Sequence, residues 1–440
     1  MKIKLLSLSL LLLLFTGFIK AQRIYELNDC IRTGLERNYS LLITRNTEKV
    51  AKNNFTPGNA GFLPTVSLSS RHSGTYNDIN QKLTDGTKDV SSDVFNTTSS
   101  AGVTIGMTIF EGFNVLTTYK KLGELKNIGE LNTQLEIENL IADLVSGYYN
   151  YIQQVQLFKN IEYAVTLSKE RLRIDEDRYL LGSSSKLQVL QSRVYLNADS
   201  SRLSRQGEVV RAAQIRLNEM MAVDNLADSF ASKDTSININ PDLIYSKLLE
   251  ETLSKNTSLQ IAARNKIISE YDYRLIASRS YPYLNLSSGY SYSFNTYSSS
   301  SLRNQGTSGL NYGLTLGMNL FDGFNQLRSL RNSSIEIDNK ELRYREIEQG
   351  VKADMLTIYS AYSNYLRLVT LEEQNLQTAT ENLFIAMERY KLGSLSGIDL
   401  REVQKSLLDA RESLLSVQYQ TKLAEISLLL ISGRIMDYYQ

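Results

Sequence analysis

One histidine and one cysteine limit the catalytic and metal-binding chemistry open to this chain of 440 residues. Cys30 alone forms no intrachain disulfide or cysteine-based zinc site, and His72 alone excludes any His-paired metal motif. A serine nucleophile would have to use His72, which lies in a segment rich in Ser, Gly and Thr. The chain also lacks a Gly-x-Ser-x-Gly elbow and a Walker loop. We therefore expect no enzyme activity, no catalytic residue, no metal and no cofactor.

A pair of carboxylates offers the other chemistry that the sequence suggests. Asp399 and Glu402 are three residues apart in a segment with helical periodicity, so they share a helix face. A solvated helix face, on which Lys405 pairs with Glu402, is one interpretation of this pair, and the spacing alone does not assign it a role.

The overall charge argues against a nucleic-acid partner. The chain has 48 basic and 47 acidic residues, which gives a net charge of +1. So balanced a composition does not build the strong positive field on which phosphate-driven binding depends.

The first 21 residues have the features of an export signal. Lys2 and Lys4 precede an apolar run over residues 5–18. Ile19-Lys20-Ala21 follows as the expected cleavage site. We therefore expect the mature chain to begin at Gln22. An uncleaved anchor is the alternative, although the apolar run has about 14 residues and a spanning helix needs about 20. No later segment holds 18 consecutive apolar residues, so we expect no α-helical membrane span.

The chain consists of two similar halves. Residues 106–116 and 317–327 are identical at seven of eleven positions, at an offset of 211. Upstream the offset is 218, and it pairs Pro64 with Pro282. Two repeats therefore explain the length better than three domains do. The predicted parts are a first repeat over residues 22–223, a polar linker over 224–241 and a second repeat over 242–440.

Each repeat is expected to fold as a helix, a hairpin and two further helices. Apolar residues recur every three or four positions over residues 27–60 and 243–278, which predicts an amphipathic helix. After Pro64 and Pro282 the period becomes two, which predicts one β-hairpin per repeat. No proline then interrupts the chain up to residue 240 or to its end, so very long helices are permitted. We predict long helices over 115–178 and 326–389, with return helices over 183–222 and 394–432.

The predicted strand from Leu310 to Leu320 has one apolar face and one face of Gly, Thr and Asn. Its length suits a tilted membrane strand of about 9–11 residues, and its alternation suits a lipid-facing wall around a polar lumen. An ordinary sheet packed on a core is the alternative. Four strands cannot close a barrel, because the smallest barrels have about eight, so we expect several chains to contribute.

A turn with the pattern Phe-(Glu/Asp)-Gly-Phe-Asn follows each hairpin. Its residues include Phe110 and Gly112 in the first repeat, and Phe321 and Gly323 in the second. We expect the glycines to relieve backbone strain, and Asn114 and Asn325 to be N-caps of the long helices.

Taken together, these features resemble the TolC family of outer-membrane efflux proteins, also called outer membrane factors. The resemblance rests on the signal sequence, the doubled helix–hairpin–long-helix unit, the Phe-(Glu/Asp)-Gly turn and Arg-Tyr-x-x-Gly-Ser at each helical turn. It covers essentially the whole mature chain. It implies a mostly α-helical fold with a membrane β-barrel, in which a homotrimer builds a 12-stranded outer-membrane barrel and a coiled-coil tunnel across the periplasm.

The resemblance also implies a function and partners. Family members are passive exit ducts of tripartite efflux pumps or type I secretion systems, for small molecules or exported proteins. A periplasmic adaptor, or membrane fusion protein, couples the duct to an inner-membrane pump, and outer-membrane lipid surrounds the barrel. A secreted or periplasmic coiled-coil protein without channel activity is the alternative, although it does not explain two alternating hairpins.

The resemblance assigns roles to residues at the helical turns. The tunnel tip, where adaptor docking is expected, has two parts: Tyr179, Gly182 and Ser183, and Tyr390, Gly393 and Ser394. Two helix turns that serve geometry alone are the alternative. The resemblance places Asp399 and Glu402 at the tunnel constriction, where concentrated carboxylates favour cations, and the solvated helix face is the alternative. Leu395 and Gln188 depart from the family pattern of a gate-locking arginine and an acid, so a salt-bridge latch is not expected there.

Overall fold

The computed structural model describes residues 23–299 and 302–439, and the predicted export signal over residues 1–21 lies outside them. The chain divides into two compact units. The helical unit comprises the chain up to Arg45, Thr133–Leu259 and the chain from Glu348 onward. The sheet unit comprises Asn46–Asn132 and Gln260–Ile347.

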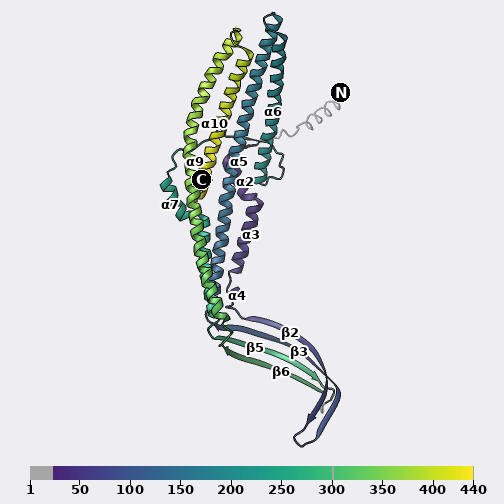
Figure 1. The fold of residues 1–440 in the computed structure, drawn as a ribbon. Coiled ribbons are helices and arrows are strands. Elements are labelled where there is room, and N and C mark those ends of the chain that lie inside the picture. The colour runs from purple at the N-terminus through teal and green to yellow at the C-terminus, as the bar shows by residue number, and fades with distance from the viewer. Residues whose placement is uncertain (1–22, 300–301, 440) are drawn as a thin grey trace, which may run out of the picture. The chain divides into compact units, whose positions relative to one another are not determined.

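The helices occur as matched pairs at the offsets seen in the sequence. The long helices α5 (Asn114–Leu180) and α9 (Asn325–Lys391) have 67 residues each. The return helices α6 (Lys186–Met220) and α10 (Gly397–Ile431) have 35 each, and each lies beside its long helix (Figure 1). Each prediction of these helices is confirmed to within a few residues at the ends. Among the residues described, no helix combines the length and apolar character that a membrane crossing requires.

The leading helix of each repeat is broken, which the periodicity did not predict. The first repeat has α2 (Leu27–Arg37), α3 (Tyr39–Asn54) and α4 (Pro57–Ala60), and the second has α7 (Tyr245–Lys255) and α8 (Thr257–Ser278). Asn38 and Asn256 stand at the equivalent breaks. Each side-chain oxygen accepts a hydrogen bond from the backbone N–H three residues on, at 3.1 Å, which caps the next helix. Each side-chain amide donates to a carbonyl at the end of α6 or α10, at 3.0 Å.

The core of the helical unit lies where α2, α5, α6, α7, α9 and α10 meet. Its fully buried side chains include Ile31, Leu144, Tyr148, Leu217 and Leu428. A short parallel pair of strands, β1 (Arg23–Tyr25) and β4 (Phe230–Ser232), joins the chain start to the linker. The 3-10 helix η1 (Ile435–Tyr438) adds Ile435 to the same core.

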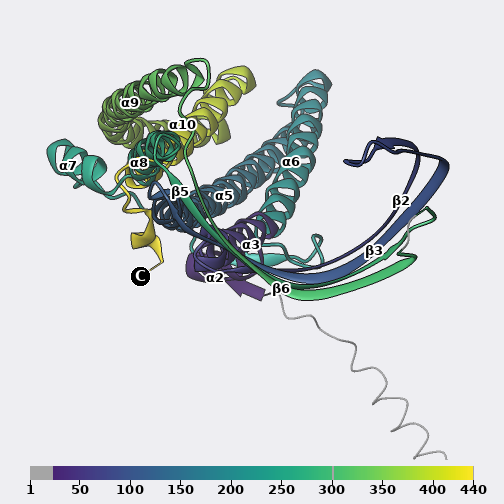
Figure 2. The ribbon, with the colours of Figure 1, turned by 90° about the horizontal axis from the view of Figure 1, so that it is seen from below.

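The sheet unit contains a four-stranded antiparallel sheet whose strands run along an arc (Figure 2). Its order is β2 (Thr65–Lys82), β3 (Lys88–Glu111), β5 (Tyr283–Thr296) and β6 (Asn304–Gly317). The hairpin of β2 and β3 extends beyond that of β5 and β6, which accounts for the longer first repeat. The predicted strand over Leu310–Leu320 was displaced: β6 begins earlier and ends at Gly317, because Met318 to Leu320 already lead into the turn before α9.

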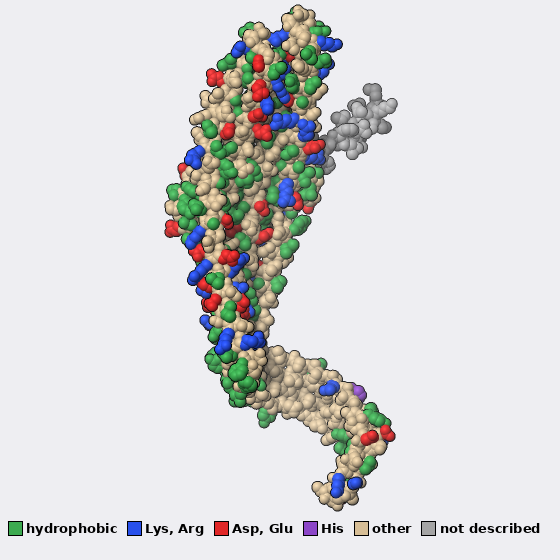
Figure 3. Space-filling model, viewed as in Figure 1, with side chains coloured by type: hydrophobic (Ala, Val, Ile, Leu, Met, Phe, Trp, Pro, Cys, Tyr) green, Lys and Arg blue, Asp and Glu red, His purple; other side chains and the backbone are tan. Residues whose placement is uncertain are grey.

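Hydrogen-bonded registers give the sheet one apolar and one polar face. Residues paired across strands share a face, and the rows run through all four strands. One apolar row is Leu68–Val103–Tyr290–Leu310, and a second is Val66–Ile105–Ser288–Tyr312. The rows between them contain Ser, Thr, Gly and Asn. In Figure 3 the face of the sheet turned to the viewer carries few hydrophobic side chains over most of its length.

Candidate functional site: the helical turns and the sheet

The turn between α5 and α6 is closed by backbone geometry that its glycine allows. Gly182 has φ +74°, and the Ser183 N–H donates back to the Arg178 carbonyl at 2.8 Å. The Ser183 hydroxyl donates to the same carbonyl at 3.1 Å. This is the left-handed C-terminal cap that favours glycine. Ser185 then caps α6 by accepting from the Gln188 N–H at 3.4 Å.

The turn between α9 and α10 repeats every one of these interactions. Gly393 has φ +80°, and the Ser394 N–H and hydroxyl donate to the Arg389 carbonyl at 2.9 and 3.0 Å. Ser396 caps α10 by accepting from the Asp399 N–H at 3.1 Å. The structure therefore brings the six predicted turn residues together as two equivalent turns in the helical unit.

The two turns present apolar side chains to solvent. Leu180, Leu181 and Leu392 are each more than four-fifths exposed. The two equivalent tyrosines differ, because Tyr179 is 45% exposed and Tyr390 only 3%. The Tyr390 ring thus packs inside the helix pairs, where it positions the turn instead of facing solvent.

Tyr390 belongs to a buried polar network that the sequence did not reveal. Its hydroxyl donates to the Asp175 carboxylate in α5, which also accepts from the Ser192 hydroxyl in α6. The Arg171 guanidinium lies 3.9 Å from the same carboxylate. Burial, and then the bond to Asp175, raise the pKa of Tyr390 to about 12. The network thus joins α5 and α6 of one repeat to α9 of the other.

A second buried carboxylate makes a similar connection. Asp199 in α6 accepts two hydrogen bonds from the Arg401 guanidinium in α10, and one from the Ser168 hydroxyl in α5. No pattern near Asp199 distinguishes it from a surface acid. Only the register between the two helical pairs brings these groups together.

The predicted constriction residues lie on the surface of α10. Asp399 and Glu402 are both exposed in the single chain. The Asp399 carboxylate accepts a hydrogen bond from the Ser396 hydroxyl at 2.7 Å, so it also stabilises the helix start. Neither Glu402 nor Lys405 forms a recorded ion pair within the described chain, so the alternative of a pair between them gains no support. Leu395 packs in an apolar cluster with Leu400 and Tyr390.

The two strand–helix turns share an unusual backbone. Gly112 and Gly323 have φ +56° and +69°, as the strain argument predicted, and Phe113 and Phe324 are also in the left-handed region. Phe110 packs edge-on against Phe113, and Phe321 packs edge-on against Phe324, each at 5.4 Å between ring centroids.

The prediction of asparagine N-caps at these turns was wrong. Asn114 and Asn325 are the first helical residues, and the carbonyls of the preceding phenylalanines accept the first helical hydrogen bonds at 3.0 Å. In the second repeat the Asp322 carboxylate caps α9 by accepting from the Gln326 N–H at 2.8 Å. Two successive left-handed residues shift the helix start relative to the sequence pattern.

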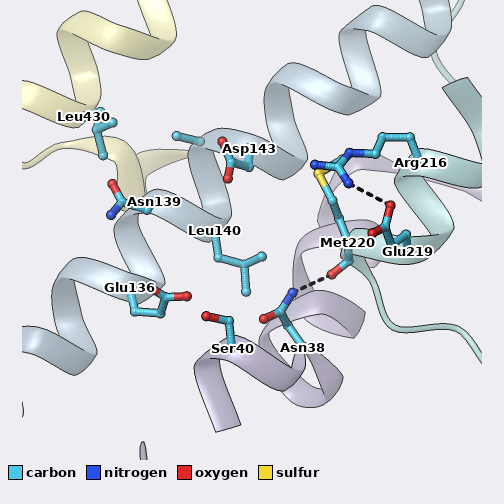
Figure 4. Close-up of a pocket in the computed structure, with 11 residues that line it drawn as sticks. Asn38, Ser40, Glu136, Asn139, Leu140, Asp143, Arg216, Glu219, Met220 and Leu430 are labelled. Carbon is cyan, nitrogen blue, oxygen red and sulfur yellow. Dashed lines mark hydrogen bonds and ion pairs between the residues drawn. The ribbon is translucent and has the colours of Figure 1, made fainter. Parts of the chain in front are cut away.

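A polar cavity of about 540 Å³ lies in the helical unit between α3, α5 and α6 (Figure 4). Glu136, Asp143 and Glu219 line it, and Arg216 pairs with Glu219 at 2.7 Å. Burial raises the pKa of Asp143. Within the described residues, no group of three His, Cys, Asp or Glu side chains could hold a metal ion. We assign this cavity no chemistry.

Comparisons with known proteins fit this architecture. A family model described as "Outer membrane efflux protein" matches residues 248–434. Over this segment, which lies within the second repeat, the chain is similar to outer membrane efflux proteins. This chain is 24% identical over 347 residues to "Cation efflux system protein CusC" of Escherichia coli (strain K12). The alignment covers 73% of this chain and 72% of that protein.

Solved channels share the fold. The Campylobacter jejuni CmeC outer membrane channel aligns with a TM-score of 0.77 at 15% identity, over 93% of this chain and 85% of that chain. The open state of the Neisseria gonorrhoeae MtrE outer membrane channel aligns with a TM-score of 0.70 at 16% identity, over 93% and 89%. The chain therefore has the fold of these channels, with paired long helices and a four-stranded sheet.

Proposed function

We propose that this protein is a trimeric exit duct of a tripartite efflux pump. The proposal depends on the four-stranded sheet. It has an exposed apolar face, and its edge strands β2 and β6 have no further strand partner among the described residues. Unpaired edges are not tolerated in lipid, and four strands are too few to close. Three chains give 12 strands, and β6 of one copy then pairs with β2 of the next.

The two faces of the sheet suit a barrel wall. Leu310, Tyr312, Leu314 and Leu316 are each about two-thirds exposed or more, and they lie on the same face. In the trimer this face contacts lipid, and the face of Ser, Thr, Gly and Asn lines the lumen. The exposed Phe113, Phe321 and Phe324 at the strand–helix turns suit the membrane interface.

The helical turns suit a docking tip. Leu180, Leu181 and Leu392 expose apolar surface that a partner protein would bury. We propose that a periplasmic adaptor contacts these turns and couples the duct to an inner-membrane pump. Asp399 and Glu402 follow the second turn on the exposed surface of α10, and three copies would surround the narrow part of the tunnel.

The decisive test combines gene deletion with sizing of the extracted protein. We expect the deletion strain to become more sensitive to dyes, detergents, antibiotics or metal cations, and plasmid-borne protein to restore resistance. Metal cations are included because the relative CusC is named for cation efflux. Carbonate washing should leave the protein in the outer-membrane fraction. After detergent extraction, native sizing should show a trimer. A monomer in the soluble periplasm would overturn the proposal and favour a periplasmic coiled-coil protein.

Export of a protein substrate is the second candidate, because a duct of a type I secretion system needs the same barrel and tunnel. Comparison of the culture medium of the deletion strain with that of its parent separates the two candidates. Loss of a specific exported protein, with unchanged drug and metal sensitivity, would favour secretion.

A further inference from the structure

Arg71 stands alone as a charged side chain within the four-stranded part of the sheet. This part comprises residues 65–74 of β2, 97–106 of β3, 287–296 of β5 and 304–313 of β6, which pair in rows through all four strands. Every other described residue there is apolar, small, or polar without a carboxylate, lysine or arginine group, apart from His72. Arg71 is therefore the one arginine, lysine or acidic residue in this described part of the sheet.

The hydrogen-bonded register places Arg71 on the polar face. Arg71 pairs with Ser100, Ser100 with Ser293, and Ser293 with Thr307, so all four residues form one row. The flanking rows on this face are Ser69–Gly102–Ser291–Gly309 and Ser73–Thr98–Asn295–Gln305. Leu68, three positions before Arg71 in β2, lies on the opposite face, together with the apolar rows.

No acid in the described chain neutralises this charge. Arg71 is exposed and forms no recorded hydrogen bond or ion pair. Glu111 is 11 residues from Ser100 along β3, or about 36 Å at the rise of a strand, and Asp93 is seven residues away in the other direction, or about 23 Å. Both separations exceed the Debye length of about 8 Å at 0.15 M salt, so the guanidinium acts as a single positive charge.

We propose that Arg71 determines the charge preference of the barrel lumen by forming a ring of three guanidinium groups that attracts anionic solutes. The inference rests on the proposed trimer. Twelve strands about 4.8 Å apart, tilted by about 40°, enclose a backbone radius of about 12 Å. Each guanidinium projects inward from that wall, so much of the cross-section lies within about one Debye length of a positive charge. A guanidinium suits carboxylate and phosphate groups, which it binds through paired hydrogen bonds.

Reversal potentials of the pore in planar bilayers under a KCl gradient test the ring. We expect Arg71→Gln to lower the chloride-to-potassium permeability ratio by about two- to fourfold at 0.1 M salt, with little change at 1 M, where the Debye length is about 3 Å. Arg71→Lys keeps the charge and should behave like the original. Arg303→Gln removes a cation outside the paired strands, so it should have a smaller effect.

Moving the charge within its row gives a stricter test. The double variant Arg71→Gln, Ser293→Arg restores the positive charge on the same face two strands away and should restore chloride permeability. Arg71→Cys permits the same test in a pore that has already assembled, because a cationic thiol reagent should raise the ratio and an anionic one should lower it. Cys30 is fully buried, and its pKa is raised to about 12, so the original protein is an unreactive control.

The outcomes separate this inference from the proposed function. Absence of conducting pores in the original protein would count against the proposed function. Conducting pores in which Arg71→Gln leaves the permeability ratio unchanged would overturn the ring alone. A change in Arg71→Lys as large as that in Arg71→Gln would also overturn it, because side-chain shape would then matter instead of charge.

Discussion

Arg401 in α10 donates two hydrogen bonds to Asp199 in α6, at 2.7 and 2.8 Å, and thereby joins the helical pairs of the two repeats. Asp199 is buried, and the Arg401 side chain is 23% exposed. Asp199→Ala would leave a largely buried guanidinium unpaired. We expect the free energy of unfolding to fall by about 3 kcal/mol, the lower end for a broken buried pair, because Arg401 keeps some contact with solvent. Urea unfolding of the detergent-extracted protein, followed by circular dichroism, measures this change.

The ion pair of Arg202 and Glu412 provides a matched control. It also joins α6 to α10 at 2.7 Å, but both side chains are about half exposed. Arg202→Ala should therefore cost less than about 1 kcal/mol. Equal losses in the two variants would show that burial does not distinguish these pairs.

Tyr390→Phe should alter both the stability and its dependence on alkaline pH. The variant removes the hydrogen bond to Asp175, and a bond to a charged group contributes about 1.5–3 kcal/mol. Because the pKa of Tyr390 is raised to about 12, the folded protein keeps this proton after the unfolded chain has lost it. The resulting stability is complete below about pH 10 and disappears as pH rises toward 12. Tyr390→Phe should therefore be less stable at neutral pH and should lose less stability between pH 10 and 12.

Tyr179→Phe is the control for this titration, because Tyr179 is the equivalent residue of the first repeat and is 45% exposed. Unfolding midpoints across this pH range should match those of the original protein. If Tyr390→Phe gives the same pH profile as Tyr179→Phe, the buried hydrogen bond does not contribute to stability.

Gly112→Ala and Gly323→Ala should differ, although the two glycines are equivalent in sequence. Both have positive φ, so alanine costs about 1–2 kcal/mol at either position. A methyl group at Gly112 would also lie 2.3 Å from the Ser278 carbonyl oxygen and 2.8 Å from the Tyr281 Cβ. At Gly323 the nearest atom is the Asn325 Nδ2, at 3.8 Å. Gly112→Ala should thus lower the free energy of unfolding by about 2 kcal/mol more, which urea titration would detect. Similar losses would mean that the backbone around Ser278 adjusts.

The sequence predicted the parts of the fold that depend on local pattern. Long proline-free stretches yielded α5 and α9, and the change of period after Pro64 and Pro282 located the hairpins. The duplication predicted that the helices and hairpins would occur as equivalent pairs, such as α5 with α9 and α6 with α10. The breaks at Asn38 and Asn256 were missed, because a single capping asparagine hardly alters the apolar periodicity on either side.

The connections between the repeats could not be predicted. Tyr179 and Tyr390 occupy equivalent turns, yet only Tyr390 meets a buried carboxylate, at Asp175. The difference arises from the helix that packs against each turn, and a repeat pattern contains no such information. The same limit applies to Arg71, whose face became clear only from the hydrogen-bonded register.

Asp399 and Glu402 should give the tunnel a preference for cations. The double variant Asp399→Asn, Glu402→Gln removes two charges per chain and keeps similar side-chain shapes, including an acceptor for the Ser396 hydroxyl. If three copies surround a narrow lumen, we expect the potassium-to-chloride permeability ratio to fall by about two- to fourfold at 0.1 M salt. The variant Asp399→Glu, Glu402→Asp retains both charges and should keep the original ratio. An unchanged ratio in the uncharged variant, in pores of normal conductance, would return both residues to a solvated helix face, because a charge outside the ion path has little effect on permeability.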